Sequence, residues 1–248
     1  SVFAESLEVP LIAVENEGFF ESVRAVVNAD DVELPGPFAL ARVRLGERRP
    51  RLAGQVVLAE LLAERGLIVQ AISDLSGAYY NEKGIDIEAA VQYVQKNKGS
   101  LAGFAGAEKI NRDDILTLPV DVLVPAATED VITASNAPHI QARLIVEGAN
   151  GPTSSRADSI INQKGIMVVP DILANAGGVT VSYFEWVQNR LGYKWDAERV
   201  NRRSDRIMKE AFNKVYQTAQ QYNVSMRIAA YMVAIDKVAK TYQYRGGY

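Results

Sequence analysis

The sequence contains no cysteine, and His139 is its only histidine. Disulfide bonds, thiolate nucleophiles and cysteine-based zinc sites are therefore excluded, and so is any metal site that needs several histidines. A Ser-His-Asp triad would have to use His139, but no nucleophile-elbow motif accompanies that residue. We expect a surface histidine at the end of a helix, and no metal site.

The sequence also has little net charge and no long hydrophobic run. A charge of −3 over 248 residues gives no general attraction to nucleic acid or to an anionic membrane. The longest apolar stretch, 165–184, is interrupted by a proline, an aspartate, an asparagine and a Gly-Gly pair, so it cannot cross a bilayer as a helix. The first ten residues contain Glu5 and Glu8 and no basic flank of a secretory signal. Together with the absence of cysteine, this predicts a cytoplasmic protein without nucleic-acid or membrane partners.

Short strand-like and helix-like segments alternate from about residue 58 onwards. Runs of β-branched and apolar residues predict strands at 67–72, 120–125, 142–147 and 166–169. Helical spacing predicts the end of a helix at 58–65 and helices at 86–98, with Asp86 as N-cap, and at 154–164. This alternation is typical of parallel βαβ units. We therefore expect an α/β fold with an open, doubly wound, mostly parallel sheet.

The C-terminal third has a different pattern. Between residues 196 and 242 the sequence is charged and mostly helical, with a break at 222–225. Apolar residues such as Ile207, Ala211 and Val215 recur at helical spacing. We expect two antiparallel C-terminal helices that cover the sheet or reach another domain.

Ligands of doubly wound sheets bind beyond the carboxyl ends of the strands, so the residues that follow each predicted strand form the candidate site. These are Asp74, 125–127, 148–150 and 170–178. Asp74 stands where a dinucleotide-binding fold has an acceptor for the adenosine ribose hydroxyls, but a turn or helix-capping aspartate fits equally well. For 147–153 alone, a loop followed by a helix cap is the simpler interpretation.

The segment 170–179 is hard to explain by packing alone. It brings polar and small residues directly after a predicted strand, and its Gly177-Gly178 pair precedes a helix-compatible segment at 180–189. A Gly-Gly turn at a helix N-terminus presents free N–H groups and the positive end of the helix dipole to a carboxylate or phosphate. Ser182 would lie one turn into this helix, within reach of a bound carboxylate. We favour this interpretation over a tight turn with a glycine cap.

These motifs resemble the signature of the glutamate dehydrogenases, which belong with the leucine, phenylalanine and valine dehydrogenases to one wider family. The resemblance rests on Asn175-Ala-Gly-Gly-Val-Thr-Val-Ser-Tyr-Phe-Glu-Trp-Val-Gln-Asn189 and Glu147-Gly-Ala-Asn-Gly-Pro-Thr153, with shorter matches at 80–81, 100–104, 125–127 and 170–174. It runs in order from about Leu58 to the C-terminus. The branched-chain and phenylalanine dehydrogenases share the Asn-Ala-Gly-Gly turn but lack the two longer runs, which favours the glutamate enzymes.

The resemblance implies a Rossmann-like nucleotide-binding domain of an enzyme that uses NAD or NADP. By position in the family, Asp74 would bind the adenosine ribose, Ala126 and Ala127 would pass beside the cofactor, and Asn150 and Asn175 would hold the nicotinamide end. Asp74 favours NAD, because a carboxylate repels the 2′-phosphate of NADP.

The resemblance also implies the substrate and the assembly. The reaction would be oxidative deamination of L-glutamate to 2-oxoglutarate and ammonia, and Val179 and Ser182 would face the glutamate side chain. Family members are commonly hexamers, so a homo-oligomer is implied for the full-length parent.

The sequence departs from the family in two respects. The family's catalytic lysine and aspartate belong to an N-terminal substrate domain that does not precede this segment. We therefore expect no catalytic residue in the chain, and no activity of the chain alone. The Gly-x-Gly-x-x-Gly phosphate loop is also missing, because the corresponding region, 39–54, carries isolated Gly46 and Gly54 and a cluster of arginines.

We therefore divide the chain into an atypical, irregular N-terminal segment, 1–57, and a dinucleotide-binding domain with C-terminal helices, 58–248. We expect the N-terminal segment to be partly disordered or the product of a frame slip, because arginine codons read one nucleotide later can encode the glycine loop. A solvated charged face is the simplest explanation of the arginines. Two alternatives to this enzyme remain open: a non-catalytic nucleotide-binding or interaction module, and a dehydrogenase of another amino acid.

Overall fold

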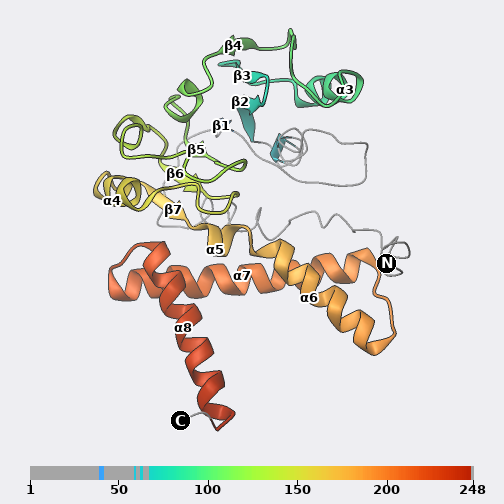
Figure 1. Cartoon of the computed structure of the whole chain (residues 1–248), viewed down its shortest axis with the longest axis vertical. Helices are drawn as coiled ribbons and strands as arrows, with labels where there is room; N and C mark the ends of the chain where they lie inside the picture. Colours follow the sequence, from blue (N-terminus) through green and yellow to red (C-terminus); the bar gives the residue numbers. More distant parts are fainter. Residues whose placement is uncertain (1–38, 42–58, 60–61, 64–66, 247–248) are drawn as a thin grey trace, which may run out of the picture.

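The computed structural model describes residues 39–41, 59, 62–63 and 67–246, and the element labels follow Figure 1. In this part of the chain seven strands form one sheet in the order β4-β3-β2-β1-β5-β6-β7. The strands are β1 (Ala39–Ala41), β2 (Ile68–Asp74), β3 (Gly77–Tyr80), β4 (Glu108–Ile110), β5 (Val122–Leu123), β6 (Leu144–Val146) and β7 (Met167–Val169). β2, β1, β5, β6 and β7 are parallel, and β3 and β4 join antiparallel at one edge. The predicted α/β fold with a mostly parallel sheet is confirmed.

The strand order reverses around β1. The chain runs from β1 to its neighbour β2 on one side and later returns to β5 on the other. In doubly wound sheets a ligand crevice opens at such a reversal, beyond the carboxyl ends of the strands. The loops that follow β2, β5, β6 and β7 are therefore the ones that matter for the site.

The four strands predicted from apolar runs are all present as β2, β5, β6 and β7, although β5, β6 and β7 are shorter than their runs. The sequence pattern indicated neither β1 nor the antiparallel β3 and β4. β1 falls within the N-terminal segment 1–57, where we predicted no strand, and it occupies the middle of the sheet. The other expectations for 1–57, the frame slip and the arginine cluster included, lie outside the described residues.

Helix α3 (Ile87–Lys96) begins directly after its predicted N-cap, Asp86, and helix α4 (Ser155–Gln163) lies within the predicted helix 154–164. The Asp86 carboxylate accepts the N–H of Ala89 at 2.9 Å, and the Ser154 hydroxyl accepts the N–H of Ala157 at 3.4 Å. Each satisfies a backbone donor that the first helical turn leaves without a partner. The predicted helix before β2 is helical at residues 59 and 62–63, the positions described there.

The core has two parts, one on each face of the sheet, because neighbouring strand residues point to opposite faces. Val122, Val124, Leu144 and Val146 belong to the part that also contains the buried residues of α3 and of the C-terminal helices. Leu123, Ile145 and Val168 belong to the other, together with Ala157 and Ile161 of α4. The sheet is thus covered on both faces, which explains why the parallel strands β5, β6 and β7 are apolar throughout.

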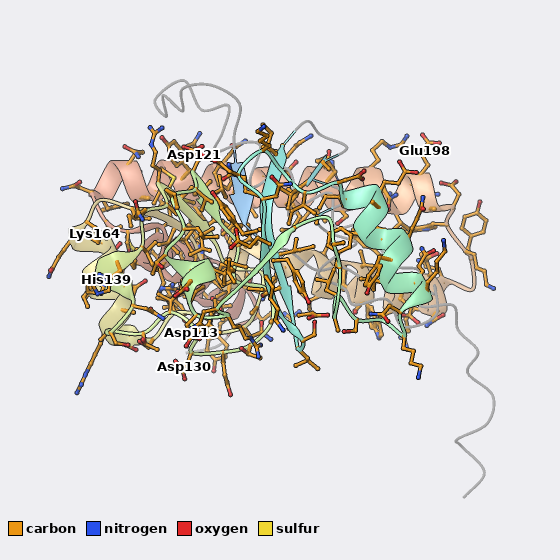
Figure 2. The ribbon with its side chains drawn as sticks, turned by 90° about the horizontal axis from the view of Figure 1, so that it is seen from above. Asp113, Asp121, Asp130, His139, Lys164 and Glu198 are labelled. Carbon is orange, nitrogen blue, oxygen red and sulfur yellow. The ribbon has the colours of Figure 1, made fainter. Side chains whose placement is uncertain are left out.

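The predicted surface histidine is confirmed. His139 is exposed and ends a short 3-10 helix, η2 (Ala137–His139). A second 3-10 helix, η1 (Asp114–Leu116), precedes β5. The ammonium group of Lys164 donates to the carbonyl oxygens of Pro138 and Ile140, both at 2.6 Å. Figure 2 shows Lys164 beside His139 at one end of the molecule, with Glu198 at the other.

The C-terminal helices are α5 (Asp171–Ala174), α6 (Ala176–Leu191), α7 (Ala197–Tyr222) and α8 (Met226–Tyr244). Gly192, at φ 64°, ends α6, and Asn223, at φ 50°, ends α7; both residues adopt the left-handed conformation of a helix C-terminus. Asp196 and Ser225 cap the helices that follow. α6 and α7 lie beyond β7 in Figure 1, and α5 links them to the sheet.

The two predicted C-terminal helices, with their break at 222–225, are present as α7 and α8, but their predicted antiparallel packing is wrong. α8 starts at the end of α7 but then leaves it and projects from the body of the molecule (Figure 1). Only its first turns are buried, through Met226, Ala229 and Ala230, and every described residue from 235 to 246 is exposed. Among the described residues, no helix combines the length and apolar composition needed to cross a bilayer.

Candidate functional site

A hollow of about 720 Å³ lies beyond the carboxyl ends of β5 and β6. Its walls come from three loops and from the start of α6. The lining residues are Ala127, Thr128, Glu129, Gly148, Ala149, Asn150, Asn175 and Val179. Four of the predicted site residues, Ala127, Asn150, Asn175 and Val179, therefore meet in one place.

The loops after β5 and β6 are held together by backbone contacts. The N–H groups of Gly148 and Ala149 both donate to the carbonyl oxygen of Pro125, each at 3.0 Å. A β-carbon at Gly148 would lie 3.0 Å from that of Ala126, closer than side chains normally pack. Glycine at this position therefore lets the two loops approach each other.

The side chains of Asn150 and Asn175 are joined directly. The Nδ2 amide of Asn175 donates to Oδ1 of Asn150 at 2.7 Å, across 25 residues of sequence. This bond orients both amides. It leaves the NH2 group of Asn150 as a donor and the Oδ1 atom of Asn175 as an acceptor, and no other residue in the described part of the chain bonds these two groups.

A buried ionic cluster lies directly behind this pair. The Glu147 side chain is fully buried and accepts from Nη2 of Arg227 at 2.7 Å and from Nη1 at 3.0 Å. Arg227 also donates through Nε to Asp158 at 2.9 Å, and its Nη1 lies 3.6 Å from the Asp171 carboxylate. Burial alone would lower the pKa of Arg227, but the hydrogen bonds and charge of Glu147, followed by those of Asp158, raise that pKa above its ordinary value. Arg227 is therefore a permanent cation in this cluster.

The predicted turn at Gly177-Gly178 is wrong. α5 leads into α6 through Asn175 alone, so α6 begins at Ala176 and both glycines lie in its first turn. The side chain of Asn175 makes no capping bond to α6 and is free to pair with Asn150. Gly178 is exposed, and a β-carbon there would meet nothing within 4 Å among the described residues. Packing therefore does not require glycine at this position.

The remaining predicted site residues lie outside the hollow. The Ser182 hydroxyl is exposed and donates to the carbonyl oxygen of Gly178 at 3.1 Å. Asp74 is buried at the end of β2, where its Oδ1 accepts the N–H of Ser76 at 2.7 Å and the hydroxyl of Ser76 at 2.5 Å. Its Oδ2 accepts the N–H of Leu101 at 2.7 Å. These contacts are those of a turn aspartate, the alternative left open for this residue, and its role toward ribose stays a prediction.

Sequence reasoning missed Arg227, and it included Glu147 and Asp171 only as members of longer motifs. A charged residue directly after a buried strand is the one local signal that pointed to Glu147. No local signal marks Arg227, because its partner Glu147 is 80 residues away in the sequence.

A second hollow, of about 870 Å³, runs along the first half of α7. Charged and polar side chains line it, among them Asp196, Arg199, Arg203 and Asp205. It contains none of the predicted site residues and lies away from the strand ends. We therefore place the candidate site in the hollow beside Asn150 and Asn175.

The model of the Glutamate/Leucine/Phenylalanine/Valine dehydrogenase family matches residues 53–246 of the chain. That match covers well over half of the sequence. The chain belongs to this family. The resemblance stated from the sequence motifs is thereby confirmed.

Related proteins place it near the glutamate dehydrogenases of the family. It is 48% identical over 195 residues to a glutamate dehydrogenase of Thermotoga maritima, a match that covers 79% of this chain and 47% of the relative. It is 47% identical over 191 residues to glutamate dehydrogenase A2 of Halobacterium salinarum, covering 77% of this chain and 46% of the relative. The chain thus spans about half the length of these relatives.

Solved structures give the same result for the fold. A hetero-hexameric glutamate dehydrogenase of Thermus thermophilus, in a leucine-bound form, has a TM-score of 0.81 at 25% identity, covering 95% of this chain and 54% of the other. A glutamate dehydrogenase of Peptoniphilus asaccharolyticus has a TM-score of 0.71 at 33% identity, with the same coverage of 95% and 54%.

Proposed function

We propose that the chain is the cofactor-binding half of a glutamate dehydrogenase. The reaction converts L-glutamate, water and NAD(P)⁺ into 2-oxoglutarate, ammonium and NAD(P)H, with release of one proton. The observation that carries the proposal is the Asn150–Asn175 pair at the edge of a hollow beyond the strand ends. The two glutamate dehydrogenase relatives, at 48% and 47% identity, support the choice of substrate.

The Asn pair fits the carboxamide of a nicotinamide ring. A carboxamide carries one carbonyl acceptor and one NH2 donor. The NH2 of Asn150 would donate to the carbonyl oxygen, and Oδ1 of Asn175 would accept from the NH2 group. Ala126 and Ala127 would lie along the cofactor. When bound, the dinucleotide accepts the hydride from the substrate; the residues of this chain hold and orient its nicotinamide end.

Asp74 is proposed to bind the adenosine ribose and to favour NAD over NADP. Among the described residues only Leu101 donates to its Oδ2 atom, which has capacity to accept one more hydrogen bond, from a ribose hydroxyl. A carboxylate there would repel the 2′-phosphate of NADP. The expected sign of that preference is a smaller Kd for NADH than for NADPH.

Val179 and Ser182 are proposed to face the glutamate side chain. Val179 is 69% exposed at the rim of the hollow, and Ser182 follows it by three residues on α6. The two residues therefore lie about one helical turn apart on neighbouring faces. The proton chemistry is assigned to the other half of the full-length enzyme, so this chain alone is expected to bind cofactor without turnover.

We also propose a homo-hexameric parent enzyme in the cytoplasm. One related structure, from Thermus thermophilus, is described as hetero-hexameric. The absence of cysteine favours a reducing compartment, although it does not require one.

Titration of the chain with NADH and NADPH, followed by nicotinamide fluorescence, tests the proposal. The variant Asn150→Asp keeps the oxygen that accepts from Asn175 but loses the donor, so we expect the Kd for NADH to rise about tenfold. Asn189→Asp adds the same charge at an exposed position of α6 and serves as the matched control. Binding of neither dinucleotide would instead support a non-catalytic module that has lost cofactor recognition.

A dehydrogenase of another amino acid is the second candidate, because the family also includes leucine, phenylalanine and valine enzymes. Supplying the substrate-binding half of a glutamate dehydrogenase in trans separates the two. Glutamate-dependent NAD(P) reduction supports the first candidate, whereas reduction that depends on leucine, phenylalanine or valine supports the second.

A further inference from the structure

We propose that Arg227 is a positioning residue for the nicotinamide site: it fixes the two loops that carry Asn150 and Asn175 relative to each other. The functional part of this inference rests on the proposed cofactor site. Arg227 does not line the hollow, so it would act only through its partners.

Arg227 is anchored in the body of the molecule. It is the second residue of α8, directly after the Ser225 cap, and its neighbours Met226, Ala229 and Ala230 are buried. Its own side chain is 19% exposed. The guanidinium therefore points inward from a fixed helix start, at the base of the helix that projects in Figure 1.

The contacts of Arg227 reach both loops of the site. Glu147 accepts hydrogen bonds from two nitrogens of Arg227, and the loop 148–150 follows it directly. Asp171, whose Oδ1 lies 3.6 Å from Nη1, precedes Asn175 by one turn of α5. One cation thus bridges the segment before Asn150 and the segment before Asn175.

Two further hydrogen bonds join the loops behind the Asn pair. The N–H of Asp171 donates to Oε2 of Glu147 at 2.9 Å, and the N–H of Gly151 donates to Oδ2 of Asp171 at 2.8 Å. The first bond joins the start of α5, which follows β7, to Glu147, which follows β6. The second joins the loop after β6 to the same residue of α5, Asp171. Both depend on carboxylates that Arg227 neutralises.

The arrangement requires arginine and not simply a positive charge. A guanidinium has a planar fork that satisfies two carboxylate oxygens at once and leaves Nε for a third acceptor. A lysine would keep the charge but could not bind Glu147 through two nitrogens and Asp158 through a third. Without Arg227, the fully buried Glu147 would face Asp158 and Asp171 without compensation, and repulsion would separate the loops.

The test compares Arg227→Lys with Arg206→Lys in the full chain. Arg206 forms an exposed pair with Glu210 on α7, so its replacement controls for the same chemical change elsewhere. Two ligands are titrated: NADH, and ADP-ribose, which has the adenosine, both riboses and the diphosphate but no nicotinamide. Hydrogen exchange is measured on both variants without ligand.

We expect Arg227→Lys to raise the Kd for NADH about tenfold, the scale of losses when partners behind ligating side chains are removed, while the Kd for ADP-ribose changes less than about twofold. Exchange should accelerate at the N–H groups of Gly151 and Asp171 in Arg227→Lys and stay unchanged in Arg206→Lys. A purely structural role would weaken both ligands alike, and that result would overturn the inference.

The exchange measurement also tests the positioning role of Arg227 when no cofactor is bound. If the wild-type chain binds neither NADH nor NADPH, the proposed function fails, but faster exchange at Gly151 and Asp171 still supports the positioning role. Unchanged exchange at both positions in Arg227→Lys would contradict it, whatever the ligands do.

Discussion

The loops on the two sides of β1 are held in different ways. On the side of β2, the Asp74 carboxylate closes the turn between β2 and β3 by accepting from Ser76, and it also accepts the N–H of Leu101. On the other side, β5, β6 and β7 contain only two or three residues each, and their loops are held by side chains: Glu147, Asp171, Arg227 and the Asn150–Asn175 pair. The turn after β2 is closed within three residues of sequence, by Asp74 and Ser76. Short parallel strands leave loop geometry to buried polar contacts, so the candidate site depends on charges far apart in sequence.

The largest expected effect of a single change falls on the side of β5 to β7. Replacing Glu147 by Ala removes one partner of a buried ion pair and leaves Arg227 with only Asp158 and Asp171. We expect the free energy of unfolding to fall by about 3 kcal/mol, measured by urea denaturation.

Glu198→Ala is the control for that change, because Glu198 pairs with Arg202 on the surface of α7 and is 88% exposed. Its loss should change the free energy of unfolding by less than about 1 kcal/mol. Equal effects of the two substitutions would show that the buried cluster does not hold the loops.

Asp74→Ala tests the other side. The N–H of Leu101 would lose its acceptor in a buried place, and the two bonds from Ser76 would also be lost. We expect a loss of about 2 kcal/mol in the urea experiment. Hydrogen exchange should increase at Ser76 and Leu101 but not at Gly151; an increase at Gly151 would mean that the two sides are not independent.

Gly148→Ala should have a smaller effect on stability. The new methyl group would lie 3.0 Å from the β-carbon of Ala126, so the loops after β5 and β6 must move apart. We expect a loss of about 1 kcal/mol and weaker NADH binding. A variant with wild-type stability and affinity would show that the close approach of these loops is dispensable.

Gly178→Ala should have the smallest effect, and of opposite sign. Gly178 lies in the first turn of α6 with open space around its missing β-carbon, and glycine within a helix is less stable than alanine. We expect a gain of about 0.5–1 kcal/mol in the free energy of unfolding. If Gly178→Ala also weakens NADH binding, glycine at this position allows a ligand to approach the helix closely. If NADH affinity is unchanged, glycine has no such role there.

Local patterns predicted the parts of the fold that depend on neighbouring residues. The β-branched runs predicted β2, β5, β6 and β7, and Asp86 marked the start of the helix that it caps. Ala39–Ala41 has little intrinsic preference for a strand, and it becomes β1 through pairing with β2 and β5 on either side. That pairing joins segments that are distant in sequence, so no local pattern predicts it.

The candidate site was predictable where residues follow strands, and not where contacts span the fold. Ala127, Asn150 and Asn175 meet in the hollow as the strand-end rule indicates, and Val179, which only the family resemblance implied, also lines it. The Gly177-Gly178 pair predicts a turn, because glycine disfavours helices. In the structure α6 follows α5 after a single residue, and both glycines lie in the first turn of α6. The role of Arg227 was not predictable, because a single arginine in a charged helical region has no distinguishing local pattern.

The side-chain amide signals of Asn150 and Asn175, followed by nitrogen-15 NMR during titration with NADH, test the central claim most directly. Both signals should shift in step with the fluorescence titration, and AMP, which lacks nicotinamide, should leave them in place. Shifts of equal size with AMP, or NADH binding that leaves both amides unmoved, would contradict a nicotinamide site between these two residues.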